Sequence, residues 1–193
     1  EMSFEQRYTS YIEVFSEPQQ RGLLGNRNAG RSEAISAAFT RAARGDALNR
    51  MLVVDAETQL PDDLLMLTDK MTMATSLECR VPLLDHELVE LAAAMPEGIK
   101  IKNGRLKHIM KEALQGILPV DILDRKKRGF GTPMGAWLKR ELAPLLRNLL
   151  SEQVVNQRGL FNPAEINALI RAHEANHIDG TDRLLALMNL EVW

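Results

Sequence analysis

Hydrophobic residues recur at three- and four-residue spacing along most of the chain, a pattern typical of helices that bury one face. The clearest run extends from Leu48 to Asp55 and resumes, beyond Leu60-Pro61, from Leu64 to Met71. Because proline lacks an amide hydrogen and its ring clashes with the preceding turn, we expect two helices that meet there. The carboxylate of Asp62 stands where it would cap the second of them.

The same spacing predicts several more helices, over residues 4–15, 33–44, 86–95, 107–118, 134–150 with a break at Pro144, 163–177, and from about 181 to the end. Asn162-Pro163-Ala164-Glu165 combines an N-cap, a first-turn proline and an acidic residue, which predicts a helix start. Alternation typical of a strand occurs only over Gly98–Lys102, which leads into an expected turn at Asn103-Gly104. We therefore predict an all-α fold, with one domain over residues 1–193.

Composition narrows the class of protein. With 193 residues and 45% hydrophobic content, the chain can bury one sizeable core. Its net charge of −2 gives no general basic field for nucleic acid or an anionic membrane, and we expect neither as a partner. No apolar run approaches the roughly 18 residues of a membrane span, and no signal peptide is recognisable.

Cysteine usage and the chain ends add two expectations. Cys79 is the only cysteine, so no internal disulfide forms, and we expect a buried thiol in a cytoplasmic protein. The sequence begins with Glu1, and the helical spacing of its hydrophobic residues still continues at Trp193, so we expect a fragment of a longer chain.

Positive charge is concentrated in one segment of this slightly acidic chain. Nine lysine and arginine residues stand there: Lys100, Lys102, Arg105, Lys107, Lys111, Arg125, Lys126, Lys127 and Arg128. His108 adds a tenth cation when it is protonated. Such a segment is either a solvated face or a site for a polyphosphate or adenylate. The following Gly129–Pro133 favours the site, because glycines let the backbone approach a ligand closely.

Three stretches, Leu60–Leu65, Asp69–Glu90 and Arg125–Pro133, resemble the signature of the glutamine-hydrolysing asparagine synthetase family, in the C-terminal part of its synthetase domain. The likeness is strong over residues 46–135 and looser over 1–45 and 160–193. The resemblance implies that the helical array belongs to an α/β ATP-pyrophosphatase-type domain. It also implies a ligase that converts aspartate, ATP and glutamine into asparagine, AMP, pyrophosphate and glutamate through an acyl-adenylate.

The resemblance carries over to particular residues. It assigns Lys127 as the lysine that stabilises the charge formed on attack, and Lys107, twenty residues earlier, as its companion. Lys126, Arg128, Gly129, Phe130 and Gly131 then form a pyrophosphate or adenylate loop. ATP and Mg²⁺ are implied as ligands of the full-length enzyme, and neither is expected to bind this fragment.

A further set of motif residues is expected to support the structure. Glu78, Arg80 and Asp85 are of a kind that forms a partly buried ionic network, which is costly to break once one partner is removed. Three others, Asp62, Asp63 and Lys70, match the motif without an assigned chemical role.

The family's pyrophosphate loop, Ser-Gly-Gly-x-Asp-Ser, its later Gly-Asp-Glu stretch and its N-terminal catalytic cysteine do not occur in this sequence. We therefore expect the missing glutaminase and nucleotide-binding parts of the same chain to be its partners, and the fragment alone to be inactive. The acceptor carboxylate stays open, as do a homodimer, a related amidotransferase or β-lactam synthetase-like enzyme, and a non-catalytic helical interaction module.

A rival pattern occurs near the C-terminus. His173-Glu174-Ala175-Asn176-His177 matches the H-E-x-x-H zinc motif, and Gly180 follows at the metzincin spacing. The third ligand position falls on Arg183, which offers no lone pair to a metal. We therefore regard a zinc peptidase as a chance match and predict no metal ligand.

Overall fold

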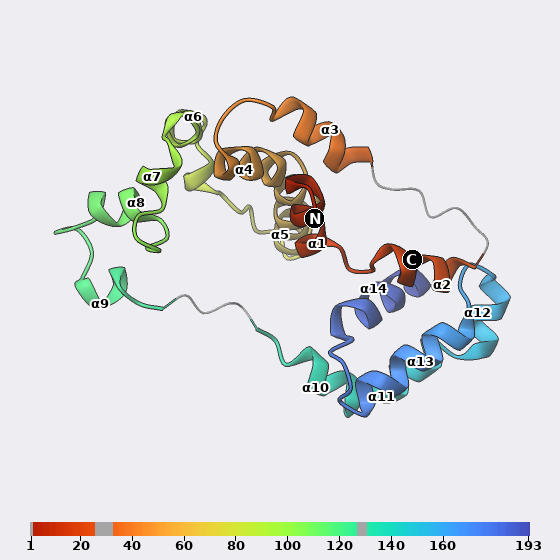
Figure 1. Cartoon of the computed structure of the whole chain (residues 1–193). Helices are drawn as coiled ribbons and strands as arrows, with labels where there is room; N and C mark the ends of the chain where they lie inside the picture. Colours follow the sequence, from red (N-terminus) through yellow and green to blue (C-terminus); the bar gives the residue numbers. More distant parts are fainter. Residues whose placement is uncertain (1, 26–32, 127–130) are drawn as a thin grey trace. The chain divides into compact units, whose positions relative to one another are not determined.

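Side-chain caps define several helix starts in the computed structural model, which describes residues 2–25, 33–126 and 131–193 (Figure 1). Ser3 accepts a hydrogen bond from the amide of Gln6, and Ser151 accepts one from the amide of Val154. Such acceptors satisfy amides that have no partner inside their own helix. Across the described ranges there are helices and no β-strand, so the all-α prediction is confirmed.

The chain divides into two compact units, each described by itself. Unit 1 comprises residues 1–31 and 128–193, and unit 2 comprises residues 32–127. The described helices of unit 1 are α1 (Phe4–Ile12), α2 (Glu17–Leu24), α10 (Met134–Lys139), α11 (Ala143–Leu149), α12 (Glu152–Arg158), α13 (Pro163–Glu174) and α14 (Thr181–Val192). Those of unit 2 are α3 (Glu33–Arg41), α4 (Ala47–Glu57), the π-helix η1 (Leu60–Leu65), α5 (Met66–Met73), the 3-10 helix η2 (Pro82–Leu84), α6 (His86–Ala94), α7 (Glu97–Lys100), α8 (His108–Ala113) and α9 (Val120–Leu123).

Unit 1 has a well-formed hydrophobic core, built by α2 and α10 to α14. Its buried members are Leu23, Leu138, Leu146, Leu150, Val155, Ile166, Ile170, Leu184, Leu187 and Met188. Full burial of an aliphatic side chain contributes about 2 kcal/mol relative to exposure. The amide of Asn162 also donates to the carbonyl of Leu23, 2.7 Å away, which ties α2 to α13. The C-terminal helices thus hold a stable shape of their own.

The helix boundaries observed in unit 1 agree in part with those predicted from the sequence. Pro144 lies in the first turn of α11 and separates it from α10, and Asn162 caps α13, both as predicted. We did not predict α2, although Ser16 and Gln19 form a capping box at its start. In the described chain no helix is long and apolar enough to cross a membrane.

Pro61 does not separate two helices as expected. Only two residues lie between α4 and η1, and α5 follows η1 directly. Pro61 occupies the first turn of the π-helix, where a missing amide costs least, and the wider i to i−5 turn absorbs the disturbance. Asp62 lies inside η1, which begins after Gln59, and no side chain caps the start of α5, so the predicted capping role of Asp62 is wrong.

The strand expected over Gly98–Lys102 is also wrong, because residues 97–100 form the helical turn α7. A short alternating run does not distinguish a strand from one helical turn, and the described part of the chain offers no strand to pair with. The turn that follows is confirmed. Asn103 and Gly104 both have positive φ, and Lys102 and Arg105 exchange backbone hydrogen bonds of 3.3 and 2.9 Å.

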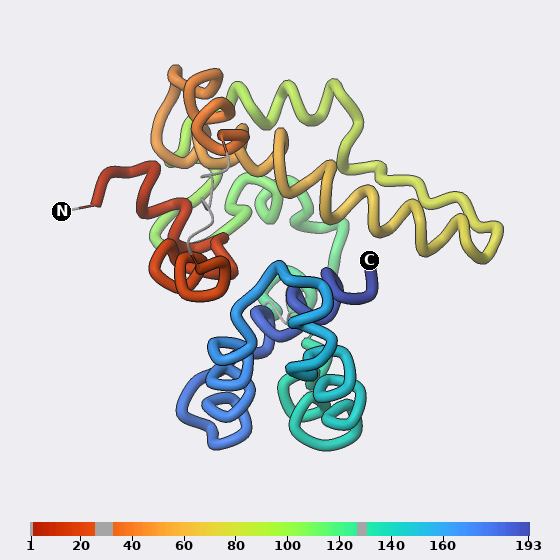
Figure 2. The backbone as a smooth tube through the Cα atoms, turned by 90° about the vertical axis from the view of Figure 1, so that its right-hand side faces the viewer, coloured from red at the N-terminus to blue at the C-terminus, as the bar shows by residue number. Residues whose placement is uncertain are grey.

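Unit 2 exposes most of its hydrophobic side chains. Figure 2 shows the chain turning back after α5, so that the segment toward α6 runs in the opposite direction. From α5 to α9, a stretch that the structure describes throughout, Leu123 is the only hydrophobic residue that is buried, and Cys79 is exposed rather than buried as expected. The large hydrophobics exposed there are Met66, Leu67, Met71, Met73, Leu77, Val81, Leu83, Leu88, Val89, Leu91, Ile99, Leu106, Ile109, Met110, Ile117, Leu118, Val120 and Ile122. We call this set the apolar face of unit 2.

Candidate functional site

Lys107 stands immediately before α8 in a left-handed backbone conformation, with φ 56° and ψ 37°. For a residue with a Cβ atom this conformation costs about 1–2 kcal/mol. Asparagine and glycine tolerate it, as at Asn103 and Gly104 nearby, but lysine has no short polar group to compensate for it. Its side chain is exposed and forms no ion pair with the residues described. Backbone strain of this kind tends to gather at functional sites.

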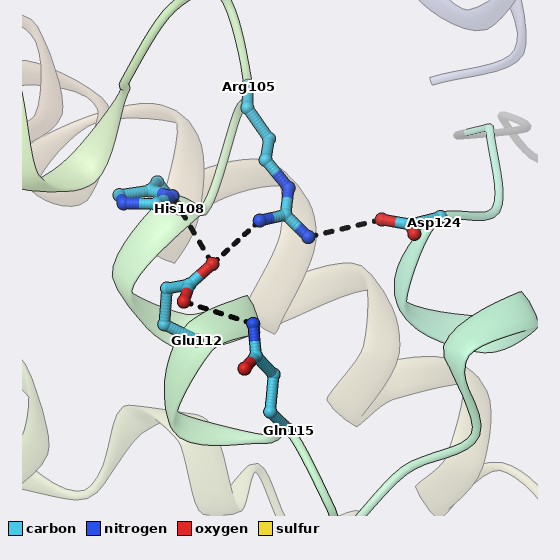
Figure 3. Close-up of polar contacts among 5 residues, drawn as sticks. All are labelled: Arg105, His108, Glu112, Gln115 and Asp124. Carbon is cyan, nitrogen blue, oxygen red and sulfur yellow. Dashed lines mark hydrogen bonds and ion pairs between the residues drawn. The ribbon is translucent and has the colours of Figure 1, made fainter.

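The guanidinium of Arg105, which stands two residues before Lys107 in the sequence, joins two carboxylates (Figure 3). Nη1 donates to Oε1 of Glu112 at 2.7 Å, and Nη2 donates to Oδ1 of Asp124 at 3.1 Å. The other oxygen of Glu112 accepts from Nε2 of Gln115 at 3.0 Å. Arg105 therefore connects the turn before α8 with α8 itself and with the residue that follows α9. Sequence reasoning counted Arg105 only as one of several cations and missed both carboxylates.

His108 completes this cluster without a hydrogen bond. Its Nδ1 lies 3.8 Å from Oε1 of Glu112, which is an ion-pair distance for a protonated ring but too long for a hydrogen bond. The same nitrogen is buried and has no hydrogen-bond partner in the described structure. His108 therefore faces a carboxylate and adds no unpaired positive charge to the segment.

The remaining cations of the basic segment differ in what they contact. The ammonium of Lys100 donates to Oδ1 of Asn49, and Arg105 is neutralised by its two carboxylates. Among the residues described, five cations have neither an ion pair nor a side-chain hydrogen bond: Lys102, Lys107, Lys111, Arg125 and Lys126. Lys127, Arg128, Gly129 and Phe130 lie outside the described residues. Gly131 is exposed, and no described atom lies within 4 Å of where its Cβ would be.

The partly buried network expected among Glu78, Arg80 and Asp85 does not form. Arg80 pairs with Glu78 at 2.8 Å, but 83% and 67% of these two side chains are exposed, so the pair adds little stability. Asp85 instead caps α6 by accepting from the amides of Glu87 and Leu88. An aspartate immediately before a helix favours this local role over a longer-range pair, because its carboxylate reaches the free amides of the first turn.

The other three motif residues are likewise not brought together into a site. Asp62 and Asp63 lie in η1 and Lys70 lies in α5, and all three are exposed.

Asp46 joins the start of α4 to the start of α7, which lies at the N-terminal end of the basic segment. This aspartate was not singled out from the sequence. Its carboxylate caps α4 through the amide of Asn49 at 2.8 Å and also accepts from the amide of Glu97 at 3.0 Å. The amide of Asn49, followed by the amide of Glu97 and the charge of Lys100, holds the pKa of Asp46 below its usual value. The Gly45-Asp46 pair before an apolar run was the available signal for the cap.

The H-E-x-x-H pattern does not form a metal site. Nδ1 of His173 accepts from the amide of Gly180 at 3.2 Å, so Nε2 carries the proton and donates to the carbonyl of Gly135 at 3.2 Å. His173 is buried, and the lone pair that a metal would need is already engaged. No group of three histidine, cysteine, aspartate or glutamate side chains in the described ranges is placed to hold a metal ion.

Comparison with known proteins adds sequence relationships to this geometry. The family model described as asparagine synthase matches residues 2–193. Asparagine synthetase [glutamine-hydrolyzing] 1 of Bacillus subtilis is 32% identical over 189 residues, which cover 97% of this chain and 30% of that protein. Asparagine synthetase [glutamine-hydrolyzing] 3 of the same organism is 52% identical over 59 residues, which cover 31% of this chain and 10% of that protein.

A more distant relative is asparagine synthetase [glutamine-hydrolyzing] of Gallus gallus, 32% identical over 89 residues, which cover 45% of this chain and 16% of that protein. No solved structure gave a match. The chain spans about 30% of the length of the first of these relatives. Because the family model matches nearly every residue, the chain belongs to the asparagine synthase family.

Proposed function

We propose that this chain is the C-terminal, helical part of the synthetase domain of an ATP-dependent, glutamine-hydrolysing asparagine synthetase. The parent enzyme is a carbon–nitrogen ligase that makes asparagine, AMP, pyrophosphate and glutamate from aspartate, ATP and glutamine. The observation that carries the proposal is Lys107, a strained and exposed lysine within the basic segment. The reaction is the one that the relatives' names state, and we propose it for the parent enzyme of this chain.

The chemistry gives the lysines a defined task. In the first step an oxygen of the substrate carboxylate attacks the α-phosphorus of ATP, pyrophosphate leaves, and an acyl-adenylate forms. Ammonia then attacks the acyl carbon, and AMP leaves. Negative charge develops on oxygen in both steps, and a preorganised ammonium stabilises it. We assign this role to Lys127, with Lys107 as its companion, and phosphate contacts to Lys126, Arg128 and the loop Gly129–Gly131.

The apolar face of unit 2 supports a larger parent protein. From α5 to α9 eighteen large hydrophobic side chains are exposed, and exposed hydrophobic side chains in such number favour a surface that another protein segment covers. The matched relative extends well beyond the region shared with this chain, since the match covers 30% of it. We propose that the remaining nucleotide-binding part of a synthetase polypeptide, of α/β ATP-pyrophosphatase type, packs on this face. A second copy of the chain is the competing occupant.

The other ligands and partners follow from the same proposal. The described residues bring no three metal-ligating side chains together, and we propose no Mg²⁺ ligand among them. ATP and Mg²⁺ would bind mainly to the remaining part of the enzyme, ammonia would come from its glutaminase part, and the chain alone would be inactive. We place the parent enzyme in the cytoplasm.

A chimera tests the proposal, in which this chain replaces the matching 30% of Bacillus subtilis asparagine synthetase 1. Pyrophosphate release is measured with ATP, Mg²⁺, aspartate and ammonia, and glutamine then replaces ammonia. We expect release that depends on aspartate and that falls by at least a hundredfold in Lys107→Ala or Lys127→Ala. Release with another carboxylate but not with aspartate would favour a β-lactam synthetase-like enzyme. A folded chimera without release would favour a non-catalytic module.

A further inference from the structure

The position of Arg105 in the sequence suggests a purpose beyond local stability. Arg105 precedes Lys107 by two residues, and its partner Asp124 precedes Lys127 by three. The ion pair of 3.1 Å therefore joins two residues nineteen positions apart, each of which shortly precedes a candidate lysine in the sequence. A single side chain thus links the backbone that carries Lys107 to the backbone just before residues 125–133, which we call the lysine loop.

The Arg105 end of this link is held by several contacts, whereas the Asp124 side chain at the other end is 61% exposed. The Asn103-Gly104 turn places Arg105, whose amide donates to the carbonyl of Lys102 at 2.9 Å. Glu112 then holds Nη1 at 2.7 Å and is itself held by Gln115. Arg105 and Glu112 are only 35% and 39% exposed, so water screens their contact less than it screens a fully exposed pair. Because Glu112 lies in α8, the link also fixes the helix that begins after Lys107.

We propose that Arg105 is a positioning residue, which sets the place of Lys107 relative to the start of the lysine loop through its two carboxylate partners. The inference rests on the proposed function. Only arginine suits the role, because its planar fork donates to two separate carboxylates at once, whereas a lysine ammonium is a point charge on a flexible stem. The strained backbone of Lys107 requires such a constraint, since an unconstrained lysine would leave the left-handed region.

The first test uses the 193-residue chain and hydrogen exchange of backbone amides. Arg105→Met should speed exchange of the backbone amides of residues 111 and 124 by at least fivefold. Asp124→Asn should have the same effect on the amide of residue 124. Arg105→Lys should resemble Arg105→Met rather than the parent. The matched control is Arg41→Met, which removes an arginine that bonds Glu57 across α3 and α4 and should leave these amides unchanged. Unchanged exchange in Arg105→Met would overturn the inference.

The second test uses the chimera and separates kcat from KM. A misplaced lysine loses interactions made in the transition state, so Arg105→Met and Asp124→Asn should each lower kcat about tenfold with little change in KM for ATP. Because both variants break one link, the double variant should lose about tenfold rather than a hundredfold. A full hundredfold loss would mean that the two residues act separately, and the inference would then be wrong.

Failure of the inference is distinct from failure of the proposed function. If Lys107→Ala leaves pyrophosphate release intact, the lysine assignment itself is wrong. If Lys107→Ala abolishes release while Arg105→Met preserves both kcat and thermal stability, only the positioning role is wrong. A purely structural role would lower the melting temperature in Arg105→Met while kcat, measured well below melting, stayed constant.

Discussion

Nε2 of His173 donates to the carbonyl oxygen of Gly135 across 3.2 Å. This hydrogen bond joins the last turn of α13 to the first turn of α10. The backbone at Gly135 comes this close because no Cβ stands in the way. A Cβ there would lie 2.5 Å from Oγ1 of Thr181, and that hydroxyl donates to Asp179 at 2.6 Å. A side chain at this position therefore requires Thr181 to move.

Gly135→Ala should destabilise unit 1 by about 1–3 kcal/mol, because Thr181 must move and give up its bond to Asp179. Thermal unfolding followed by circular dichroism measures the loss. Gly98→Ala is the control, since no described atom lies within 4 Å of where its Cβ would stand and alanine favours the helix α7. Equal melting temperatures for Gly135→Ala and the parent would contradict the packing described.

His173→Ala should cost about 2–4 kcal/mol, since it opens a cavity and leaves the amide of Gly180 and the carbonyl of Gly135 without partners. His177→Ala should leave stability unchanged, because His177 is exposed. Added zinc should raise the melting temperature of neither variant nor of the parent. One equivalent of zinc retained after dialysis, and lost in both variants, would restore the metal site.

Replacement of Lys107 should separate stability from activity. Lys107→Asn should stabilise the chain by about 1 kcal/mol, because asparagine tolerates the left-handed region and is a good helix cap. In the chimera the same variant should lose pyrophosphate release. Chemical denaturation and an enzyme assay measure the two effects. A variant that is more stable and still active would show that the ammonium has no chemical task.

Asp46 should give unit 2 an acid-sensitive contribution to stability. Its folded pKa is depressed below the ordinary value of 3.8, chiefly by the amide of Asn49. The contribution is therefore complete above that value and is lost as pH falls through the lower folded pKa. Asp46→Asn should flatten the decline of melting temperature between about pH 5 and about pH 2. An NMR titration of the Asp46 carboxyl that gives an ordinary or raised pKa would contradict the hydrogen bonding described.

Polar substitutions on the apolar face of unit 2 should improve the solution behaviour of the isolated chain but impair folding of the chimera. The double variant Met71→Gln and Leu88→Gln should reduce self-association and dye binding of the isolated chain, because both side chains are exposed there. In the chimera it should lower the yield of folded, active protein. Sedimentation velocity and pyrophosphate release measure these outcomes. A stable dimer of the parent chain that the variant dissociates would instead identify a second copy as the occupant.

Much of the helical fold follows from local features of the sequence. Apolar spacing and capping residues act within one or two turns, so Asn162, Pro144 and the Asn103-Gly104 turn were predicted correctly. Pro61 was misjudged because a π turn depends on how the flanking helices are held, which no short window of sequence contains. The resemblance of residues 46–135 to a known family likewise required only the sequence, since motif spacing survives without coordinates.

Tertiary structure decided which charges act on which. From the sequence, Arg105 was one cation among nine, and Glu112 and Asp124 were not singled out. Folding brings Arg105 to both carboxylates, and it leaves Lys107 exposed in a strained backbone. Ionic contacts between residues far apart in sequence depend on distances of a few ångströms, which composition and periodicity do not encode.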